Sequence, residues 1–156
     1  MTAAQTDGAN AFDRSREHRR GVRQACIELE ESLARPAGQD MAKWSSQTAA
    51  CCHRLTEAFQ HHAEQSEGPD GLLPEILEIA PRLAHAVEQV KHEHEVILAE
   101  IARLEAAITD RDYAGTVAKV RGDVLRILQD LAAHRQRGAD LIYEAYSVDV
   151  EGGESG

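Results

Sequence analysis

The chain has 156 residues, and its excess of acidic side chains gives a formal net charge of -10. This length fits one domain that can bury a core without disulfides or a structural metal. The negative charge argues against nucleic acid and against an anionic membrane surface as partners. Aromatic residues make up only 4% of the chain, which disfavours a sheet protein and favours an all-α fold.

Two long helices are expected in the first half of the chain. The first covers residues 11–34 and ends before Pro36, because the residue preceding a proline disfavours helix. The second covers residues 40–67, opening on an aspartate suited to capping. The Gly-Pro-Asp-Gly turn at 68–71 is expected to kink this helix, and the apolar residues 72–80 are expected to form a further short helix that extends it beyond the kink.

Two further helices are expected in the second half. The third covers residues 81–110, and the fourth starts between 113 and 116 and ends at Tyr146. Residues 1–10 and 147–156 are small, polar or acidic, and are expected to be a disordered N-terminus and a flexible tail. The predicted domain is therefore a four-helix bundle over residues 11–146.

Each predicted helix carries an apolar stripe in steps of four and three residues, which marks the buried face of a bundle helix. The stripe of the third helix comprises Leu83, Val87, Val90, His94, Ile97, Ile101, Leu104 and Ile108. The other three stripes contain one histidine each: His18, His62 and His134. The stripe of the second helix also includes Ala58, and that of the fourth includes Leu128. Counted from the turns, the four histidines reach a similar level if successive helices run in opposite directions and if residues 72–80 extend the second helix beyond its kink. The sequence thus predicts an up-down antiparallel bundle with a layer of histidines in its core.

Neutral imidazole is a common metal ligand, and side chains from facing helices can build a metal site inside a bundle. The alternative to metal binding is that each buried histidine has only a structural role and hydrogen-bonds a neighbour in the core. The remaining histidines fall off the stripes and are expected to be solvated, although a rotation of the second helix would exchange His61 for His62. These are His53, His61, His85 and His92.

The segments around these histidines resemble the hemerythrin, or HHE cation-binding, family over residues 13–146. The segments that carry the resemblance are Glu17-His18-Arg19-Arg20, Leu55-Thr56-Glu57-Ala58-Phe59-Gln60-His61-His62, Gly71-Leu72-Leu73-Pro74, Glu93-His94-Glu95 and Leu131-Ala132-Ala133-His134. The resemblance implies a metal-binding domain with iron as the metal. It also implies a role in sensing oxygen or nitric oxide, in iron handling or in redox protection.

The chain departs from the family pattern at positions that matter for a second metal. Members that bind two irons resemble one another in using five histidines and two carboxylates. Here Ser66 replaces a glutamate, Val90 replaces a histidine, and Gly138 and Ala139 stand where a carboxylate is expected. We therefore expect a single metal or none rather than a di-iron site. The candidate ligands are His18, His62, His94, His134, Glu67 and Asp140.

No motif for nucleophilic catalysis, phosphate binding or dinucleotide binding is present, so the chain is not predicted to be an enzyme. Its three cysteines form no disulfide framework, and no signal peptide or membrane span is evident, which favours a cytoplasmic protein. The alternative function is a metal-free, degenerate bundle that acts as an interaction or regulatory module. Carboxylates reaching the histidines would favour metal binding, whereas histidines that bond one another and leave no cavity would favour the alternative.

Overall fold

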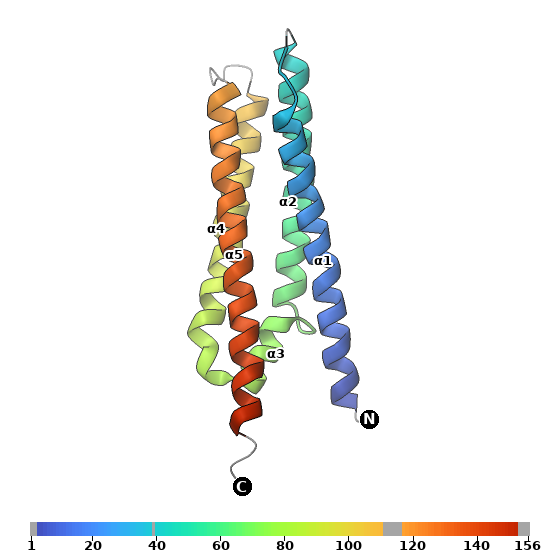
Figure 1. The fold of residues 1–156 in the computed structure, drawn as a ribbon, viewed down its shortest axis with the longest axis vertical. Coiled ribbons are helices and arrows are strands. Elements are labelled where there is room, and N and C mark those ends of the chain that lie inside the picture. The colour runs from blue at the N-terminus through green and yellow to red at the C-terminus, as the bar shows by residue number, and fades with distance from the viewer. Residues whose placement is uncertain (1–2, 39, 111–116, 153–156) are drawn as a thin grey trace.

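The computed structural model describes residues 3–38, 40–110 and 117–152, and these are helical apart from short connections (Figure 1). The helices are α1 (Ala3–Ala34), α2 (Met41–Glu67), α3 (Leu72–Ile79), the 3-10 turn η1 (Pro81–Leu83), α4 (Ala84–Thr109) and α5 (Val117–Gly152). The all-helical bundle expected from the composition is therefore confirmed. No helix in the described part of the chain combines the length and the apolar character that a membrane crossing requires.

The four long helices lie side by side along the molecule, and α3 lies across one end (Figure 1). Close contacts join α1 to α2, α2 to α4, and α4 to α5. Among the described residues, α1 and α5 approach each other much less closely. Three sides of the bundle are thus closed by paired helices, and the fourth side, between α1 and α5, is more open.

The predicted stripe of the third helix is confirmed in full, because all eight of its members are buried, Leu83 at the end of η1 and the other seven on α4. Steps of four and three residues keep these side chains on one face of a helix, and that face packs against α2 and α5. His94 lies in the middle of the stripe and is only 1% exposed. The apolar pattern of α4 therefore places an imidazole in the core.

The other stripes differ in detail from the prediction. On α2 the structure buries Phe59, whereas the predicted Ala58 is only half-buried. On α5 it likewise buries Ile127 in preference to Leu128. Both residues of each pair fit the apolar period. Packing against the facing helices therefore decides which of the two is buried.

The long helices also extend beyond their predicted ends. Residues 3–10 belong to α1 and residues 147–152 belong to α5, although both segments were expected to lie outside the bundle. The predicted tails at 1–2 and 153–156, and the predicted start of the fourth helix at 113–116, lie outside the described residues.

The connection after α2 is a full break rather than the predicted kink. The backbone N–H of Gly71 donates to the Gly68 carbonyl over 2.8 Å, which folds the chain back onto the end of α2. A Cβ at Gly71 would lie 2.3 Å from the Ser66 carbonyl oxygen, so this close approach requires glycine. As a result α3 is a separate helix, and it buries Leu72, Leu73 and Ile76 at one end of the bundle.

Candidate metal centre

The histidine layer, which we define as His18, His62, His94 and His134, separates two apolar cores. The larger core includes Phe59, Ile97 and Leu131, and the smaller one, beside α3, includes Val90 and Leu141. The helices α4 and α5 contribute to both cores, and each crosses from one core to the other through its histidine: His94, for example, lies between Val90 and Ile97 on α4. The rings of His94 and His134 are therefore held in place from both sides by packed apolar side chains.

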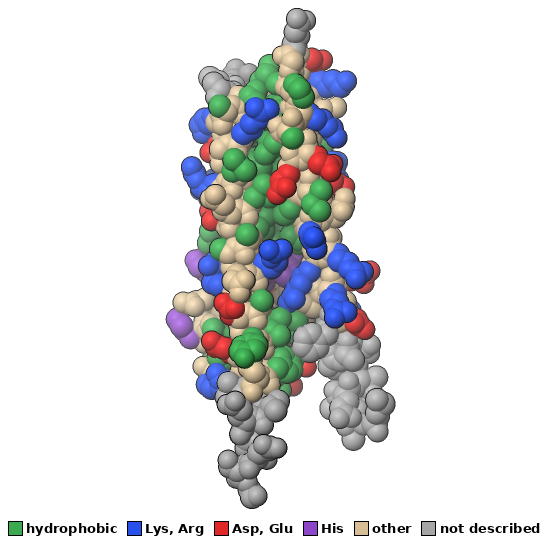
Figure 2. All heavy atoms as spheres, in the orientation of Figure 1, with side chains coloured by type: hydrophobic (Ala, Val, Ile, Leu, Met, Phe, Trp, Pro, Cys, Tyr) green, Lys and Arg blue, Asp and Glu red, His purple; other side chains and the backbone are tan. Residues whose placement is uncertain are grey.

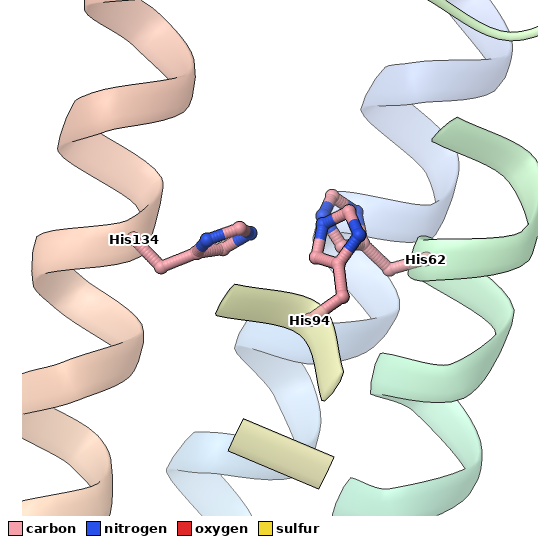
Figure 3. Close-up of side chains that lie close together, drawn as sticks. All are labelled: His62, His94 and His134. Atoms are coloured by element: carbon pink, nitrogen blue, oxygen red, sulfur yellow. The ribbon is translucent and has the colours of Figure 1, made fainter. Parts of the chain in front are cut away.

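The structure brings three of the four predicted histidines into one group, which we call the ligand triad: His62, His94 and His134. One ring nitrogen from each residue lies within 4.8 Å of the others. The ring centroids of His94 and His134 are 4.8 Å apart, and those of His62 and His94 are 5.2 Å apart. Figure 3 shows the three rings pointing toward one another from α2, α4 and α5. Such a group can place three nitrogen ligands around one ion.

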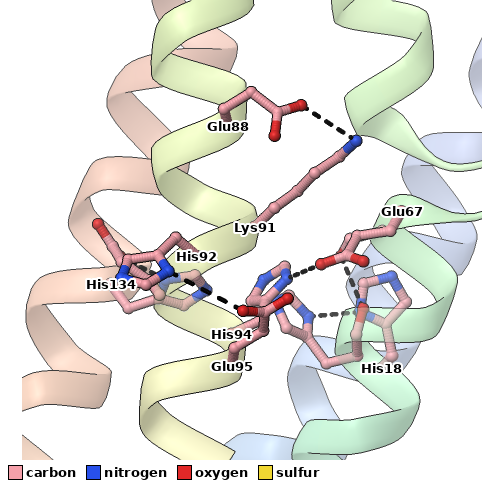
Figure 4. A network of polar contacts seen from close by, with 11 residues as sticks. His18, Glu67, Glu88, Lys91, His92, His94, Glu95 and His134 are labelled. Atoms are coloured by element: carbon pink, nitrogen blue, oxygen red, sulfur yellow. Dashed lines mark hydrogen bonds and ion pairs between the residues drawn. The ribbon is translucent and has the colours of Figure 1, made fainter.

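Two members of the triad are oriented by carboxylates. The Nδ1 of His94 lies 2.7 Å from Oε1 of Glu67 (Figure 4). The Nδ1 of His134 lies 2.7 Å from Oε2 of Glu93, whose other oxygen accepts a hydrogen bond from Arg137. A carboxylate only accepts, so each imidazole donates its Nδ1–H. The Nε2 of each ring is then left with a free lone pair, which is the tautomer that binds a metal.

The Nε2 of His94 is buried and has no hydrogen-bond partner among the described residues. A buried polar atom without a partner carries a desolvation cost of roughly 1–3 kcal/mol. Its Nδ1 is already engaged by Glu67, so rotating the ring would not remove that cost. An orphaned, basic nitrogen directed at two other imidazoles is the feature that a metal ion would satisfy.

His18 occupies a different place from the other three. Its Nδ1 lies 2.8 Å from the Nδ1 of His62, with one ring donating and the other accepting. If His62 donates, its Nε2 lone pair is free to join those of His94 and His134. His18 then acts as the hydrogen-bond partner of a ligand, as Glu67 and Glu93 do, rather than as a fourth ligand.

The electrostatics of the layer favour the neutral form of three imidazoles, those of His18, His62 and His134. Burial, together with the neighbouring histidines, lowers the pKa of His62 to about 2. Burial and the nearby Arg19 lower the pKa of His18 to about 4. The pKa of His134 is also lowered by burial, which outweighs its hydrogen bond to Glu93. Neutral rings keep the lone pairs that a cation needs.

The surroundings of Glu93 favour its charged form. Its partial burial opposes ionisation, but hydrogen bonds from Arg137 and His134 outweigh this effect and lower its pKa. Glu93 is therefore an anion at neutral pH, and it strengthens the basicity of the imidazole to which it is bonded.

Phe59 forms one wall of the layer. Its ring is 1% exposed, and its centroid lies 5.6 Å from His62, 5.7 Å from His94 and 5.6 Å from His134. An aromatic ring in contact with all three ligands excludes water on the side of the larger core. Any exchange of a small molecule with the triad must therefore come from another direction.

Of the two predicted carboxylate ligands, only Glu67 reaches the histidine layer. Glu67 reaches the layer, but its carboxylate contacts the Nδ1 of His94 on the side of the ring away from the free nitrogen. Asp140 is exposed, and its carboxylate accepts from the side-chain amide of Gln136 over 2.9 Å, so the structure does not bring it to the triad. The four histidines predicted to be solvated, His53, His61, His85 and His92, are all exposed.

Glu93 was missed as a site residue. It lies next to His94 but off the apolar stripe, where an acidic residue looks like any solvated side chain. The available signal was Arg137, three residues after His134, since a basic residue beside a seam histidine can hold a shared carboxylate. That signal is weak without the pairing of α4 with α5.

Three positions where the family pattern would supply ligands line a cavity next to the triad. They are Ser66, Val90 and Gly138, and the cavity volume is about 340 Å³. The Ser66 hydroxyl donates to the His62 carbonyl over 2.7 Å, so it is engaged by its own helix. Ala139 is exposed and does not line the cavity. Small or apolar side chains therefore leave open space where further ligands would stand.

Gly138 is not required for close helix packing, because a Cβ built on it meets nothing within 4 Å. We expect Gly138→Ala to raise the free energy of unfolding by roughly 1 kcal/mol, since glycine is that much worse than alanine inside a helix. Gly122→Ala, also on α5 with open space around its Cβ, is the matched control and should give a similar gain. Urea unfolding measures both. If Gly138→Ala alone lost stability, a side chain at this position would be unfavourable, which contradicts the open space around the Cβ of residue 138.

No family model, curated protein or solved structure matches this chain. The class of site is therefore defined by its own geometry: a buried to half-buried triad of imidazoles inside a helical bundle, with carboxylate partners on two of the three rings.

Proposed function

We propose that the chain is a hemerythrin-like, up-down helical bundle that binds a single metal ion through His62, His94 and His134. Iron is the metal that the family resemblance favours. The observation that carries the proposal is the buried Nε2 of His94, which has no hydrogen-bond partner in the described part of the chain and faces two further imidazoles. A neutral nitrogen donor set of this kind suits iron, zinc, copper or nickel.

Three protein ligands leave one or more coordination positions for a small molecule. A bound iron would supply a redox-active Lewis acid at that position. The chain's own residues then act around it: Glu67 and Glu93 fix two ring orientations, His18 fixes the third, and Phe59 excludes water. A role in oxygen or nitric oxide sensing, iron handling or redox protection fits this arrangement.

A two-metal site is not proposed. Val90 and Gly138 offer no donor atom, and the Ser66 hydroxyl is bonded to its own backbone. The side-chain carboxylates that reach the layer, Glu67 and Glu93, bind ring nitrogens. No described carboxylate is left in a position to bridge two ions.

The metal-free interaction module is the less favoured function. It requires the histidines to satisfy one another and to leave no space. The His18–His62 contact fits that description, but the Glu67 and Glu93 contacts and the adjacent cavity do not.

The direct test is titration of chelator-treated protein with Fe(II) under anaerobic conditions, and separately with Zn(II), in competition with a chromophoric chelator. We expect saturation at about one ion per chain. Saturation at two ions, or no competition with the chelator, would contradict the proposal.

Glu93→Gln is expected to weaken metal binding by about 10–100-fold, because it removes the charge that orients His134 and raises its basicity. The same titration measures the change in affinity. Glu95→Gln is the matched control, since Glu95 lies two residues away on α4 with its side chain 82% exposed. Equal affinities for the two variants would show that Glu93 has no part in the site.

A further inference from the structure

The open side of the bundle between α1 and α5 forms a cleft that reaches the histidine layer. The cavity described above is this cleft, and its lining includes side chains from both helices as well as His62, His94 and His134. Figure 2 shows histidine side chains between the two helices, with basic side chains on either side and hydrophobic side chains along the groove. The triad is thus accessible from this direction.

The mouth of the cleft is basic although the chain as a whole is acidic. Arg19 and Arg23 of α1 and Arg135 of α5 line it, and Glu30 is the single acidic residue among the described residues of the lining. None of the three arginines forms an ion pair with a carboxylate among the described residues, whereas Arg54 and Arg137 each do. Three unpaired guanidinium groups on facing helices are a site for an anion.

The walls of the cleft are mainly apolar on both sides of the histidine level. Val22 and Ile27 of α1, Leu128 and Leu131 of α5, and Leu72 and Ile76 of α3 contribute to them. Apolar surface that is left open to solvent is stabilised when an apolar ligand covers it. The volume of about 340 Å³ is near the lower end of the range for small-molecule sites, which favours a small ligand.

We propose that this cleft binds a medium-chain carboxylate, with its head group held by Arg19, Arg23 and Arg135 and its chain lying along the apolar walls. A planar guanidinium matches a carboxylate with two parallel hydrogen bonds, which selects this head group over a neutral alcohol. The site uses side chains outside the ligand triad, so it goes beyond metal binding and does not depend on it.

The test is isothermal titration calorimetry of the chelator-treated full chain with decanoate. Decanol, which lacks the charge, and acetate, which lacks the chain, are the ligand controls. We expect saturable binding of decanoate, with both controls weaker by about tenfold or more because each loses one of the two contributions. Equal binding of decanol and decanoate, or no binding of decanoate, would overturn the proposal.

Two variants locate the site. The double variant Arg23→Gln/Arg135→Gln should weaken decanoate binding by about tenfold or more, whereas Arg20→Gln, on α1 outside the lining, should leave it unchanged. Gly138→Leu should block binding by filling the cavity, and circular dichroism checks that it stays folded. Unchanged affinity in the double variant would contradict the assignment of the head group.

The cleft could instead be covered by a second copy of the chain. In that case sedimentation would show a dimer that Gly138→Leu dissociates, and decanoate would not bind, which would overturn the proposal. Because the measurements use chelator-treated protein, they succeed or fail independently of the metal titration.

Discussion

Replacing His94 by alanine is expected to abolish metal binding. His94 is the most buried member of the triad, and its Nε2 has no partner among the described residues. Its removal leaves two imidazoles from two helices, which are too few to hold an ion against water. Chelator competition with Fe(II) or Zn(II) measures the loss, which should be complete within the range of the assay.

Two controls separate ligand loss from general damage. His92→Ala lies on the same helix but is exposed, and His53→Ala is exposed on α2 with contacts to Glu57 and Glu105; both should keep full affinity. His94→Leu keeps the core filled with a side chain that fits the heptad, so it should be folded yet unable to bind. If all three alanine variants lost metal equally, the assignment of the triad would be wrong.

Lowering the pH from 7.5 to 5.5 is expected to reduce the stability of the chelator-treated protein by roughly 2–3 kcal/mol. The folded chain keeps His18 and His62 neutral, with pKa values of about 4 and about 2, whereas the unfolded chain has histidines near 6.5. Below pH 6.5 the unfolded state therefore binds more protons than the folded state. The stability is full above 6.5 and is lost as the pH falls toward the folded values.

Urea unfolding at pH 7.5, 6.5 and 5.5 gives this dependence. His53→Ala should retain the slope, because its ring is exposed in the folded chain. His62→Leu should reduce the slope, since it removes one of the groups held neutral. A free energy of unfolding that stays constant over this range would mean that the imidazoles are already solvated in the folded protein.

The sequence predicted the α4 face and the four buried or half-buried histidines because both follow from helical period alone. Every member of the Leu83-to-Ile108 stripe is buried, and His94 is where the stripe places it. For the pairs α1–α2 and α4–α5, the distance along each helix from the shared turn also predicted that the rings would meet, since the rise per residue is fixed. The count between α2 and α4 depended on residues 72–80 extending α2, whereas they form the separate helix α3.

Contacts between helices were harder to predict. Asp140 lies six residues after His134, which on a regular helix places it about 240° around the axis, on the outer face. Glu67 was predicted as a metal ligand, but α2 ends at this residue and its carboxylate lies against a ring nitrogen of His94. Glu93 became part of the site only through the packing of α4 against α5, which no local pattern specifies.

The path of the chain after α2 is a similar case. The Gly-Pro-Asp-Gly segment correctly predicted an interruption, but a turn signal does not encode the direction in which the chain leaves. That direction is set by the close approach of Gly71 to the Ser66 carbonyl and by the burial of Leu73 and Ile76 against α4 and α5. Both depend on the assembled bundle.

The most direct test of the central claim is the metal content per chain, measured by elemental mass spectrometry. The protein should be expressed in iron-supplemented medium and purified without chelator or metal-affinity resin. The proposed site predicts about one metal ion per chain, with iron the element that the family resemblance favours. Two irons per chain would contradict the single-site account and would require ligands beyond the triad. Essentially no metal would contradict it as well, and would favour the interaction module.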